Sequence, residues 1–233
     1  MGYMFKKRSD KKELLDEENI PKKNLFQNLS ELNTINTLLG GHAVTIKAIK
    51  TFQIQAHTKT RIIDIGCGGG DNLRILARYA RKNNLDVELI GIDLKSDCIE
   101  YAKQQCANYP EISFIQSDYR DLIQTGMEFD IAFACLFNHH LSNEENEKFF
   151  TWCYQHSKQG FFINDLHRNP LAYYSIKWLT RLFSKSYLVK NDAPLSVLRG
   201  FKKNELQSLL DKNNIPAISK WAWAFRYMVI CKK

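Results

Sequence analysis

The stretch that decides the fold is Arg-Ile-Ile-Asp-Ile-Gly-Cys-Gly-Gly-Gly-Asp-Asn-Leu, residues 61–73. A short β-branched run ends in glycines at 66, 68, 69 and 70, and a helical apolar pattern follows from Leu73 to Ala80. This order predicts a strand, a tight turn and a helix. Glycine permits positive φ and lets a ligand lie against the backbone, while the first N–H groups of the helix offer hydrogen-bond donors. We therefore expect a ligand at this turn.

The spacing of the glycines limits which class of ligand is expected at this turn. A dinucleotide fingerprint, counted from Gly66, would require its last glycine at position 71, where this chain has Asp71. An acid there opposes a pyrophosphate, so the pattern disfavours NAD and FAD. The spacing that fits is acid-x-Gly-x-Gly-x-Gly over residues 64–70, and in this form the chain resembles the class I S-adenosylmethionine-dependent methyltransferases. The resemblance implies S-adenosyl-L-methionine as cofactor and S-adenosyl-L-homocysteine as product.

Acids at the ends of the next two strands support this interpretation. The apolar run 87–92 predicts a buried strand that ends at Asp93, whose two carboxylate oxygens can accept both hydroxyls of a ribose, as they also do in NAD enzymes. The strand expected over 112–116 is followed by Asp118, which by resemblance receives the adenine amine, with Tyr119 beside the ring. The resemblance assigns these residues to the cofactor: Asp64, Gly66, Gly68, Gly70, Asp93, Leu94, Asp118, Tyr119 and Cys135.

Three histidines are candidate bases, because imidazole titrates near neutral pH. His139 and His140 follow the apolar strand expected over 129–135, and His167 follows the strand expected over 161–164. We expect His167 to enter the acceptor pocket as the base, whereas a structural role for His140 is equally open. Arg168 and Arg199 either pair with an acidic group of the substrate or are solvated charges.

A helix rich in aromatic residues is expected from Pro170 to Phe183. Its apolar residues nearly encircle it, so it is either sandwiched or lines an apolar pocket. We assign Tyr173, Tyr174 and Trp178 to substrate binding, within a substrate-cover insertion over residues 168–200. Residues 184–199 are expected to be a flexible connection.

Strands alternating with helices predict an α/β fold, and a hairpin is expected at the C-terminal end, over 217–223 and 225–231. The resemblance implies a Rossmann-like seven-stranded sheet of order 3-2-1-4-5-7-6 with an antiparallel last strand. Residues 25–233 are expected to form one methyltransferase domain, with a helical cap at 25–55. The charged residues 1–24 are expected to be a flexible, solvated segment.

Composition limits the possible partners and location. The 233 residues carry 33 Lys and Arg against 25 Asp and Glu, a net charge of +8. Part of this excess lies near the N-terminus rather than in a basic stripe, which does not favour nucleic acid. The six cysteines form no C-x-x-C pair and are interspersed among apolar residues, which is typical of reduced thiols in a cytoplasmic protein. We find no signal peptide, and the apolar run 131–137 is too short to span a bilayer.

The acceptor is predicted less sharply than the cofactor. Residues 35–42, 164–174 and 196–201 resemble bacterial methyltransferases associated with type III polyketide synthases, which implies O-methylation of a phenolic or polyketide-type hydroxyl and possible contact with a lipid-like substrate. The sequence 135–138, Cys-Leu-Phe-Asn, lacks the tetrapeptide of nucleic-acid amino-methyltransferases. Asn164 and Asp165 lack the further acid of a magnesium cluster, so we expect no metal.

Alternatives remain open at this stage. One is carbon methylation of a quinone-like precursor. RNA methylation and a non-catalytic binder of the methyl donor are less favoured. The sequence leaves the oligomeric state open.

Overall fold

The computed structural model describes residues 4–122 and 125–233. A seven-stranded sheet has the order β3-β2-β1-β4-β5-β7-β6, which confirms the predicted topology. β7 runs antiparallel to both of its neighbours, β5 and β6, and the other pairs are parallel. The strands are β1 (Thr60–Ile65), β2 (Val87–Asp93), β3 (Ile112–Gln116), β4 (Phe129–Cys135), β5 (Ser157–Leu166), β6 (Ala217–Ala222) and β7 (Arg226–Lys232).

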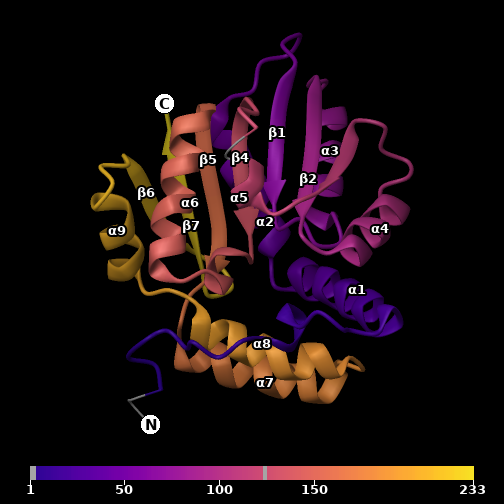
Figure 1. The fold of residues 1–233 in the computed structure, drawn as a ribbon, viewed down its shortest axis with the longest axis vertical. Coiled ribbons are helices and arrows are strands. Elements are labelled where there is room, and N and C mark those ends of the chain that lie inside the picture. The colour runs from indigo at the N-terminus through magenta and orange to yellow at the C-terminus, as the bar shows by residue number, and fades with distance from the viewer. Residues whose placement is uncertain (1–3, 123–124) are drawn as a thin grey trace.

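Helices cover both faces of this sheet (Figure 1). The α-helices are α1 (Lys22–Leu38), α2 (Gly41–Ile49), α3 (Asp71–Lys82), α4 (Ser96–Gln105), α5 (Tyr119–Leu122), α6 (Asn143–His156), α7 (Pro170–Phe183), α8 (Tyr187–Arg199) and α9 (Lys203–Asp211). Short 3-10 turns are η1 (Leu14–Asp16), η2 (Lys50–Phe52) and η3 (Asn138–His140).

Alternation along the strands divides the core into two apolar clusters. Ile62 of β1 belongs to the cluster under α2 and α3, whereas its neighbour Ile63 belongs to the cluster under α6 and α9. Successive side chains of a strand point to opposite faces, and a central parallel strand is apolar on both. The near-continuous apolar sequence of β1 and β4 follows from this burial.

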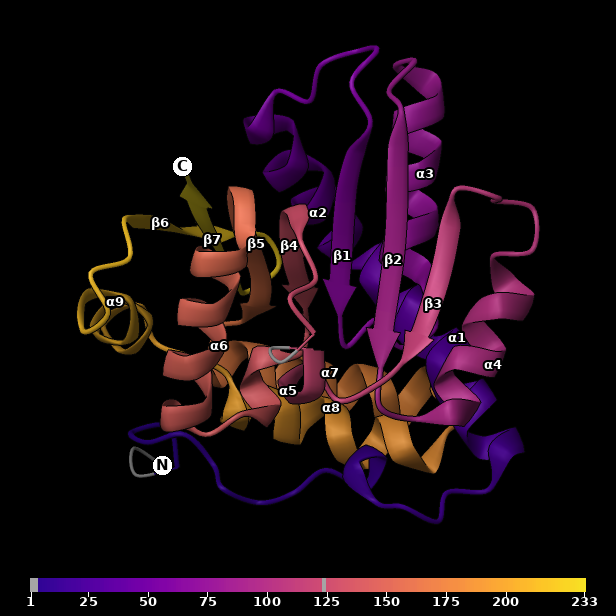
Figure 2. The same cartoon turned by 45° about the horizontal axis from the view of Figure 1, so that its top comes forward.

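A third layer closes the carboxyl ends of the strands. In Figure 1, α1, α7 and α8 lie below the strand ends, and Figure 2 shows the N-terminal segment running along this layer. The strand-end loops therefore meet this layer instead of open solvent. The functional site described below lies between the two.

The N-terminal segment is packed, whereas the sequence suggests a solvated one. Phe5 is buried and its ring contacts the edge of Tyr173, with centroids 5.7 Å apart. Glu13 is 3% exposed. The difference arises because this charged segment finds partners far along the chain, which local composition does not reveal. The first three residues of the expected segment lie outside the described residues.

The flexible connection expected over 184–199 is wrong, because α8 occupies Tyr187–Arg199. The Ser186 hydroxyl caps its first turn by accepting a hydrogen bond from the Val189 N–H. Asp192 within α8 accepts the N–H groups of Leu14 and Leu15, each at 2.9 Å. These tertiary contacts outweigh the breaking signals of Pro194 and the polar residues. Within the described ranges, no helix is long and apolar enough to cross a membrane.

Candidate functional site

The glycine turn between β1 and α3 requires its glycines. Gly66, Gly68 and Gly70 have φ of 71°, 51° and 68°, the left-handed region that favours glycine. A Cβ on Gly66 would lie 2.4 Å from Cδ2 of Phe137, in the loop after β4. Phe137 therefore packs directly against the backbone at Gly66 and leaves no room for a side chain there.

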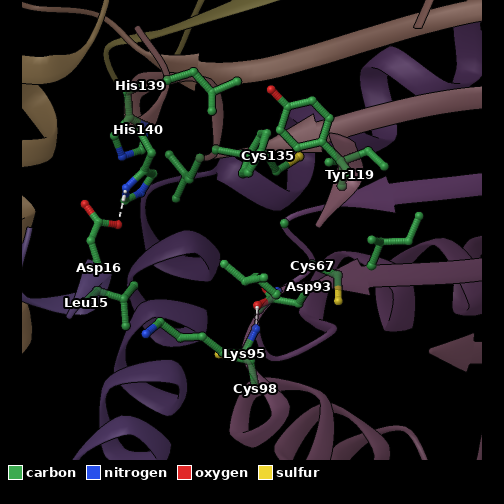
Figure 3. A pocket seen from close by; sticks show the side chains of 18 of the residues that line it. Leu15, Asp16, Cys67, Asp93, Lys95, Cys98, Tyr119, Cys135, His139 and His140 are labelled. Carbon is green, nitrogen blue, oxygen red and sulfur yellow. Dashed lines mark hydrogen bonds and ion pairs between the residues drawn. The ribbon is translucent and has the colours of Figure 1, made fainter. Parts of the chain in front are cut away.

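Asp93, at the end of β2, is held by this turn. One carboxylate oxygen accepts the N–H of Gly68 at 2.9 Å, and the other accepts the N–H of Lys95 at 3.0 Å. Figure 3 shows the Asp93 carboxylate fixed beside the turn. Burial raises the pKa of Asp93 above its ordinary value. Each oxygen keeps a lone pair, so two ligand hydroxyls can be accepted, as the sequence predicts.

A cavity of about 1230 Å³ extends from the glycine turn to the loop after β4, and we call it the main cavity. Ligand pockets typically measure about 300–1,000 Å³. The volume therefore accommodates two ligands side by side. The predicted cofactor residues that line it are Gly66, Gly68, Asp93, Leu94, Asp118, Tyr119 and Cys135.

Two predicted cofactor residues, Asp64 and Gly70, are not among the residues that line the main cavity. Asp64 is 1% exposed, and neither carboxylate oxygen has a hydrogen-bond partner among the described residues. Burial, followed by the charges of Asp71 and Asp93, raises its pKa well above the ordinary value. Asp64 is therefore a buried residue of β1, two positions before Gly66.

Asp118 lines the main cavity, but its carboxylate is engaged. The guanidinium of Arg120 donates to both oxygens, with Nη2 2.5 Å from Oδ2, and its hydrogen bond lowers the pKa of Asp118. Tyr119 is buried edge-on against Phe137 and Phe149. Asp118 would therefore have to share its oxygens with Arg120 to receive the predicted amine.

His139 is enclosed between two carboxylates. Its Nδ1 lies 2.7 Å from Oδ1 of Asp165, and its Nε2 lies 3.5 Å from Oε1 of Glu13. Burial would lower the pKa of His139, but the charges and hydrogen bonds of Asp165 and Glu13 outweigh it and raise the pKa to about 9. The ring is therefore an imidazolium at neutral pH, with both N–H groups engaged.

His140 faces the main cavity and pairs with the N-terminal segment (Figure 3). Its Nδ1 lies 2.9 Å from Oδ1 of Asp16, and its Nε2 lies 3.8 Å from Oε2 of Glu13. Burial opposes ionisation of Asp16, but the hydrogen bond from His140 outweighs it and lowers the pKa of Asp16 to about 2. Ionised Asp16 accepts the Nδ1–H of His140 and so fixes the orientation of the ring.

Arg199 binds the histidine loop instead of a free substrate group. Its guanidinium donates to the carbonyl oxygens of His139, at 3.1 Å, and His140, at 2.8 Å. Arg8 donates to the His139 and Leu141 carbonyls. The two arginines thereby fasten the N-terminal segment and α8 to the loop that carries both histidines.

His167 does not reach the main cavity, so the predicted base is misplaced. It lines a second cavity of about 580 Å³ together with Arg168 and Tyr174. The His167 backbone N–H donates to the Phe225 carbonyl, and the ring packs against Tyr227 with centroids 4.9 Å apart. β5 continues to Leu166, beyond its predicted end, and this pairing with β7 carries His167 away from the donor turn.

Of the residues predicted to bind substrate, Arg199 lines the main cavity, whereas Arg168, Tyr173, Tyr174 and Trp178 lie outside it. Arg168 is 2% exposed and donates to the Phe5 and Gly200 carbonyls and to Glu205. Tyr173 packs against Phe5, and Trp178 is exposed on the outer side of α7. Their positions indicate structural or surface roles.

Sequence analysis missed the acids that complete the site. Glu13 and Asp16 approach His139 and His140, although more than 120 residues separate them in the chain. Asp71 lines the main cavity and pairs with Nε2 of His42 at 2.7 Å. Ligand atoms of Glu13, His139 and His140 lie within 4.8 Å of one another, a spacing that a metal ion could use. No local spacing signals these groupings.

Part of the sequence matches a known protein family. Residues 62–160 match a family model described as a methyltransferase domain. A curated relative, the candidate methyltransferase YqeM of Bacillus subtilis (strain 168), is 31% identical over 97 residues, which are 42% of this chain and 37% of the relative. The chain thus matches only about a third of that protein's length.

Solved structures match over nearly the whole chain. The plantazolicin methyltransferase BpumL in complex with S-adenosylhomocysteine has a TM-score of 0.64 at 17% identity, covering 91% of this chain and 95% of that one. Human N-acetylserotonin methyltransferase in complex with S-adenosylmethionine has a TM-score of 0.63 at 15% identity, covering 91% and 56%. At these identities the likeness concerns the fold.

The fold and the matched domain define the class of this protein. It has the fold of the class I S-adenosylmethionine-dependent methyltransferases, and its residues 62–160 match a methyltransferase domain, in agreement with the predicted class. The methyl donor of this class is S-adenosyl-L-methionine, as predicted. The described residues fit it, since Gly66 and Gly68 line the main cavity and Asp93 offers oxygens for two hydroxyls.

Proposed function

We propose that this chain transfers the methyl group of S-adenosyl-L-methionine to a hydroxyl oxygen of a small, largely apolar acceptor, with a phenolic or polyketide-type hydroxyl as the favoured group. One observation carries the proposal. The main cavity joins the glycine turn and Asp93 at one end to the Asp16–His140 pair at the other. A donor and an acceptor can therefore lie in one continuous space.

The donor end of the main cavity, at the glycine turn and Asp93, binds and orients S-adenosyl-L-methionine. Asp93 accepts the ribose hydroxyls while the N–H groups of Gly68 and Lys95 hold its carboxylate in place. When bound, the donor supplies an electrophilic methyl group on a sulfonium centre. The acids Asp71 and Asp93 beside the turn favour such a cationic ligand electrostatically.

The acceptor end holds and moves a proton. Asp16 fixes the His140 ring through Nδ1, and Nε2 takes the proton of the acceptor hydroxyl. The acceptor oxygen forms its bond to the methyl carbon as the carbon–sulfur bond breaks, and S-adenosyl-L-homocysteine leaves. His140 ends as an imidazolium beside Asp16 and Glu13, whose charges stabilise it.

His139 has a different role from His140. It is already protonated and donates to Asp165 and Glu13, so it has no lone pair for a substrate proton. It positions Glu13 and keeps the loop in place. This difference assigns proton transfer to His140.

The apolar part of the cavity lining favours an apolar acceptor. Apolar residues of the N-terminal segment, of α1 and of the loop after β4 line the main cavity: Leu15, Ile20, Leu25, Leu29, Leu32, Phe137 and Leu141. A phenol suits this setting, because its hydroxyl is far more acidic than that of an alcohol and a histidine can deprotonate it. The names of the similar solved structures, which refer to plantazolicin and N-acetylserotonin, support a small-molecule acceptor.

The test is turnover of isotopically labelled donor with a panel of phenols, including alkylated ones. We expect label in an O-methyl product, a loss of rate of about a hundredfold or more in His140→Ala, and an unchanged rate in the matched variant His167→Ala. Donor affinity should be the same in all three proteins. Label on carbon would favour the quinone-type alternative, and donor binding without turnover of any acceptor would favour a non-catalytic binder.

A further inference from the structure

The outer side of α7 carries an apolar surface that nothing in the described chain covers. Leu171, Trp178 and Leu182 are 63%, 63% and 70% exposed. Tyr174 falls on the same line, since helix positions i, i+3, i+7 and i+11 share one side. We call these four residues, Leu171, Tyr174, Trp178 and Leu182, the α7 face.

The α7 face points outward because the opposite side of the helix is already packed. Ala172 and Ile176 are buried in a cluster with Val197 of α8. Beyond the end of α7, the Glu31 carboxylate accepts the N–H groups of Lys185 and Ser186, each at 3.1 Å. The helix is therefore fixed with its second apolar side exposed.

The charges around this face have one sign. Residues 170–191 contain no Asp or Glu and carry Lys177, Arg181, Lys185 and Lys190. Lys177 lies over the Tyr173 ring, 5.6 Å from its centroid, and Arg181 is exposed. Glu31 is the neighbouring acid, and its oxygens are occupied by the N–H groups beyond α7 and by the Ser184 hydroxyl.

We propose that the α7 face docks this protein on the surface of a bilayer that contains anionic phospholipid. An interfacial helix buries its apolar side at the boundary between headgroups and acyl chains, while its Lys and Arg side chains meet anionic headgroups. Trp and Tyr suit this boundary, since each has an apolar ring and a polar atom. The α7 face and its basic flank have this composition.

A second copy of the chain fits the face less well. A twofold contact places the same patch on both sides, so Lys177 and Arg181 would approach their own copies, with no Asp or Glu among residues 170–191 to offset them. Anionic headgroups neutralise the same charges. Charge complementarity therefore selects the lipid surface.

The position of α7 connects docking to the site. In Figure 1, α7 forms the lower edge of the molecule, at the end where the carboxyl ends of the strands lie. The main cavity lies at the same strand ends, since Gly66, Asp93 and Leu136 line it. Docking through the α7 face would turn this end toward the bilayer. An acceptor dissolved in the lipid would then lie near the end of the protein that holds the cavity.

The test uses the full chain in flotation with vesicles of phosphatidylcholine alone or of equimolar phosphatidylcholine and phosphatidylglycerol. We expect binding to the anionic vesicles only, with release as salt is raised, because salt screens headgroup charge. Brominated lipid should quench the fluorescence of the bound protein, and Trp178→Phe should remove the quenched part. Absence of binding to the anionic vesicles would overturn the proposal.

Matched variants distinguish binding through the α7 face from nonspecific adsorption of the protein to vesicles. Leu182→Ser should weaken vesicle binding about tenfold, and Arg181→Gln about fivefold. Ile218→Ser is the control, because Ile218 on β6 is 61% exposed and lies away from α7 (Figure 1). Every variant should retain binding of S-adenosyl-L-homocysteine. Equal vesicle binding by Leu182→Ser and the control would refute the assignment, as would a dimer that is lost in Leu182→Ser without any vesicle binding.

Discussion

Asp16 and His140, 124 residues apart in the sequence, form a hydrogen bond of 2.9 Å at the wall of the main cavity. The pair links the N-terminal segment to the loop after β4. As in the acid–histidine pairs of hydrolases, the carboxylate determines which ring nitrogen carries the hydrogen. In the proposed mechanism, the contact that joins the N-terminal segment to the loop after β4 is therefore also the contact that orients the base.

Replacing Asp16 with Asn should slow turnover by about ten- to a hundredfold while sparing donor affinity. The amide can donate to Nδ1 of His140 and so favour the wrong tautomer, with the hydrogen on Nε2. Steady-state rates and calorimetry with S-adenosyl-L-homocysteine measure the two effects separately. Asp10→Asn is the control, because Asp10 lines the same cavity and no hydrogen bond joins it to either histidine in the described part of the chain. An equal loss in both variants would contradict the role of Asp16.

Asp93→Ala should weaken binding of S-adenosyl-L-homocysteine by about ten- to a hundredfold, since hydrogen bonds to a charged group contribute about 1.5–3 kcal/mol. The variant also frees the N–H groups of Gly68 and Lys95. Isothermal calorimetry gives the affinity. Asp86→Ala, an exposed acid just before the other end of β2, should bind like the wild type. Unchanged affinity in Asp93→Ala would refute the assignment of the donor site.

Alanine substitutions at two glycines distinguish the energetic cost of backbone strain from that of steric crowding. Gly66 and Gly126 have similar φ, 71° and 65°, but a Cβ on Gly66 meets Phe137 at 2.4 Å, whereas one on Gly126 has no neighbour within 4 Å among the described residues. Gly126→Ala should lose about 1 kcal/mol from the strained φ alone. Gly66→Ala should lose about 2 kcal/mol more, from overpacking, and should also lose donor affinity. Denaturant unfolding of the two variants measures the difference, and equal losses would contradict it.

The predictable part of the site is the part built from consecutive elements. The glycine turn, Asp93 and Asp118 each follow a strand directly, and parallel strands bring their carboxyl ends to one edge, so topology alone gathers them. His167 also follows a strand, yet the pairing of β5 with β7 turns it to another cavity. Register with a strand sixty residues later is not encoded in the local pattern.

The burial of acids in the N-terminal segment also could not be predicted from the local sequence. Glu13 lies in a run whose composition is typical of a solvated tail, and its burial depends on Arg199 and His139. The local sequence around Arg199 and His139 does not indicate that either residue pairs with Glu13. Contacts between distant charged groups have no periodicity to detect, and so they could be found only in the structure.

Chelation should leave turnover unchanged, in keeping with the prediction of no metal. Glu13, His139 and His140 have the spacing of ligands, but Arg199 lies 3.8 Å from Glu13 and His139 already carries a proton. These cations balance the carboxylates and repel a divalent ion. Rates before and after dialysis against EDTA, with metal analysis of the purified protein, provide the measurement. Loss of activity that zinc or manganese restores would contradict the expectation.

Stability should fall as pH rises through the pKa of His139. The ordinary pKa of histidine is 6.5, and in the folded protein that of His139 is about 9. Below pH 6.5 both the folded and the unfolded chain hold the proton, and the contribution is fully present. Between 6.5 and 9 only the folded chain holds it, so the contribution declines as pH rises and is lost above about 9.

The size of this effect is at most about 3 kcal/mol, from a shift of about 2.5 pKa units. Urea unfolding at pH 6, 7.5 and 9 should show the decline in the wild type, where the ion pairs with Asp165 and Glu13 are lost. His139→Gln should be less stable at pH 6 and should lack this decline, because the amide does not titrate. A wild-type slope in His139→Gln would show that another group binds the proton.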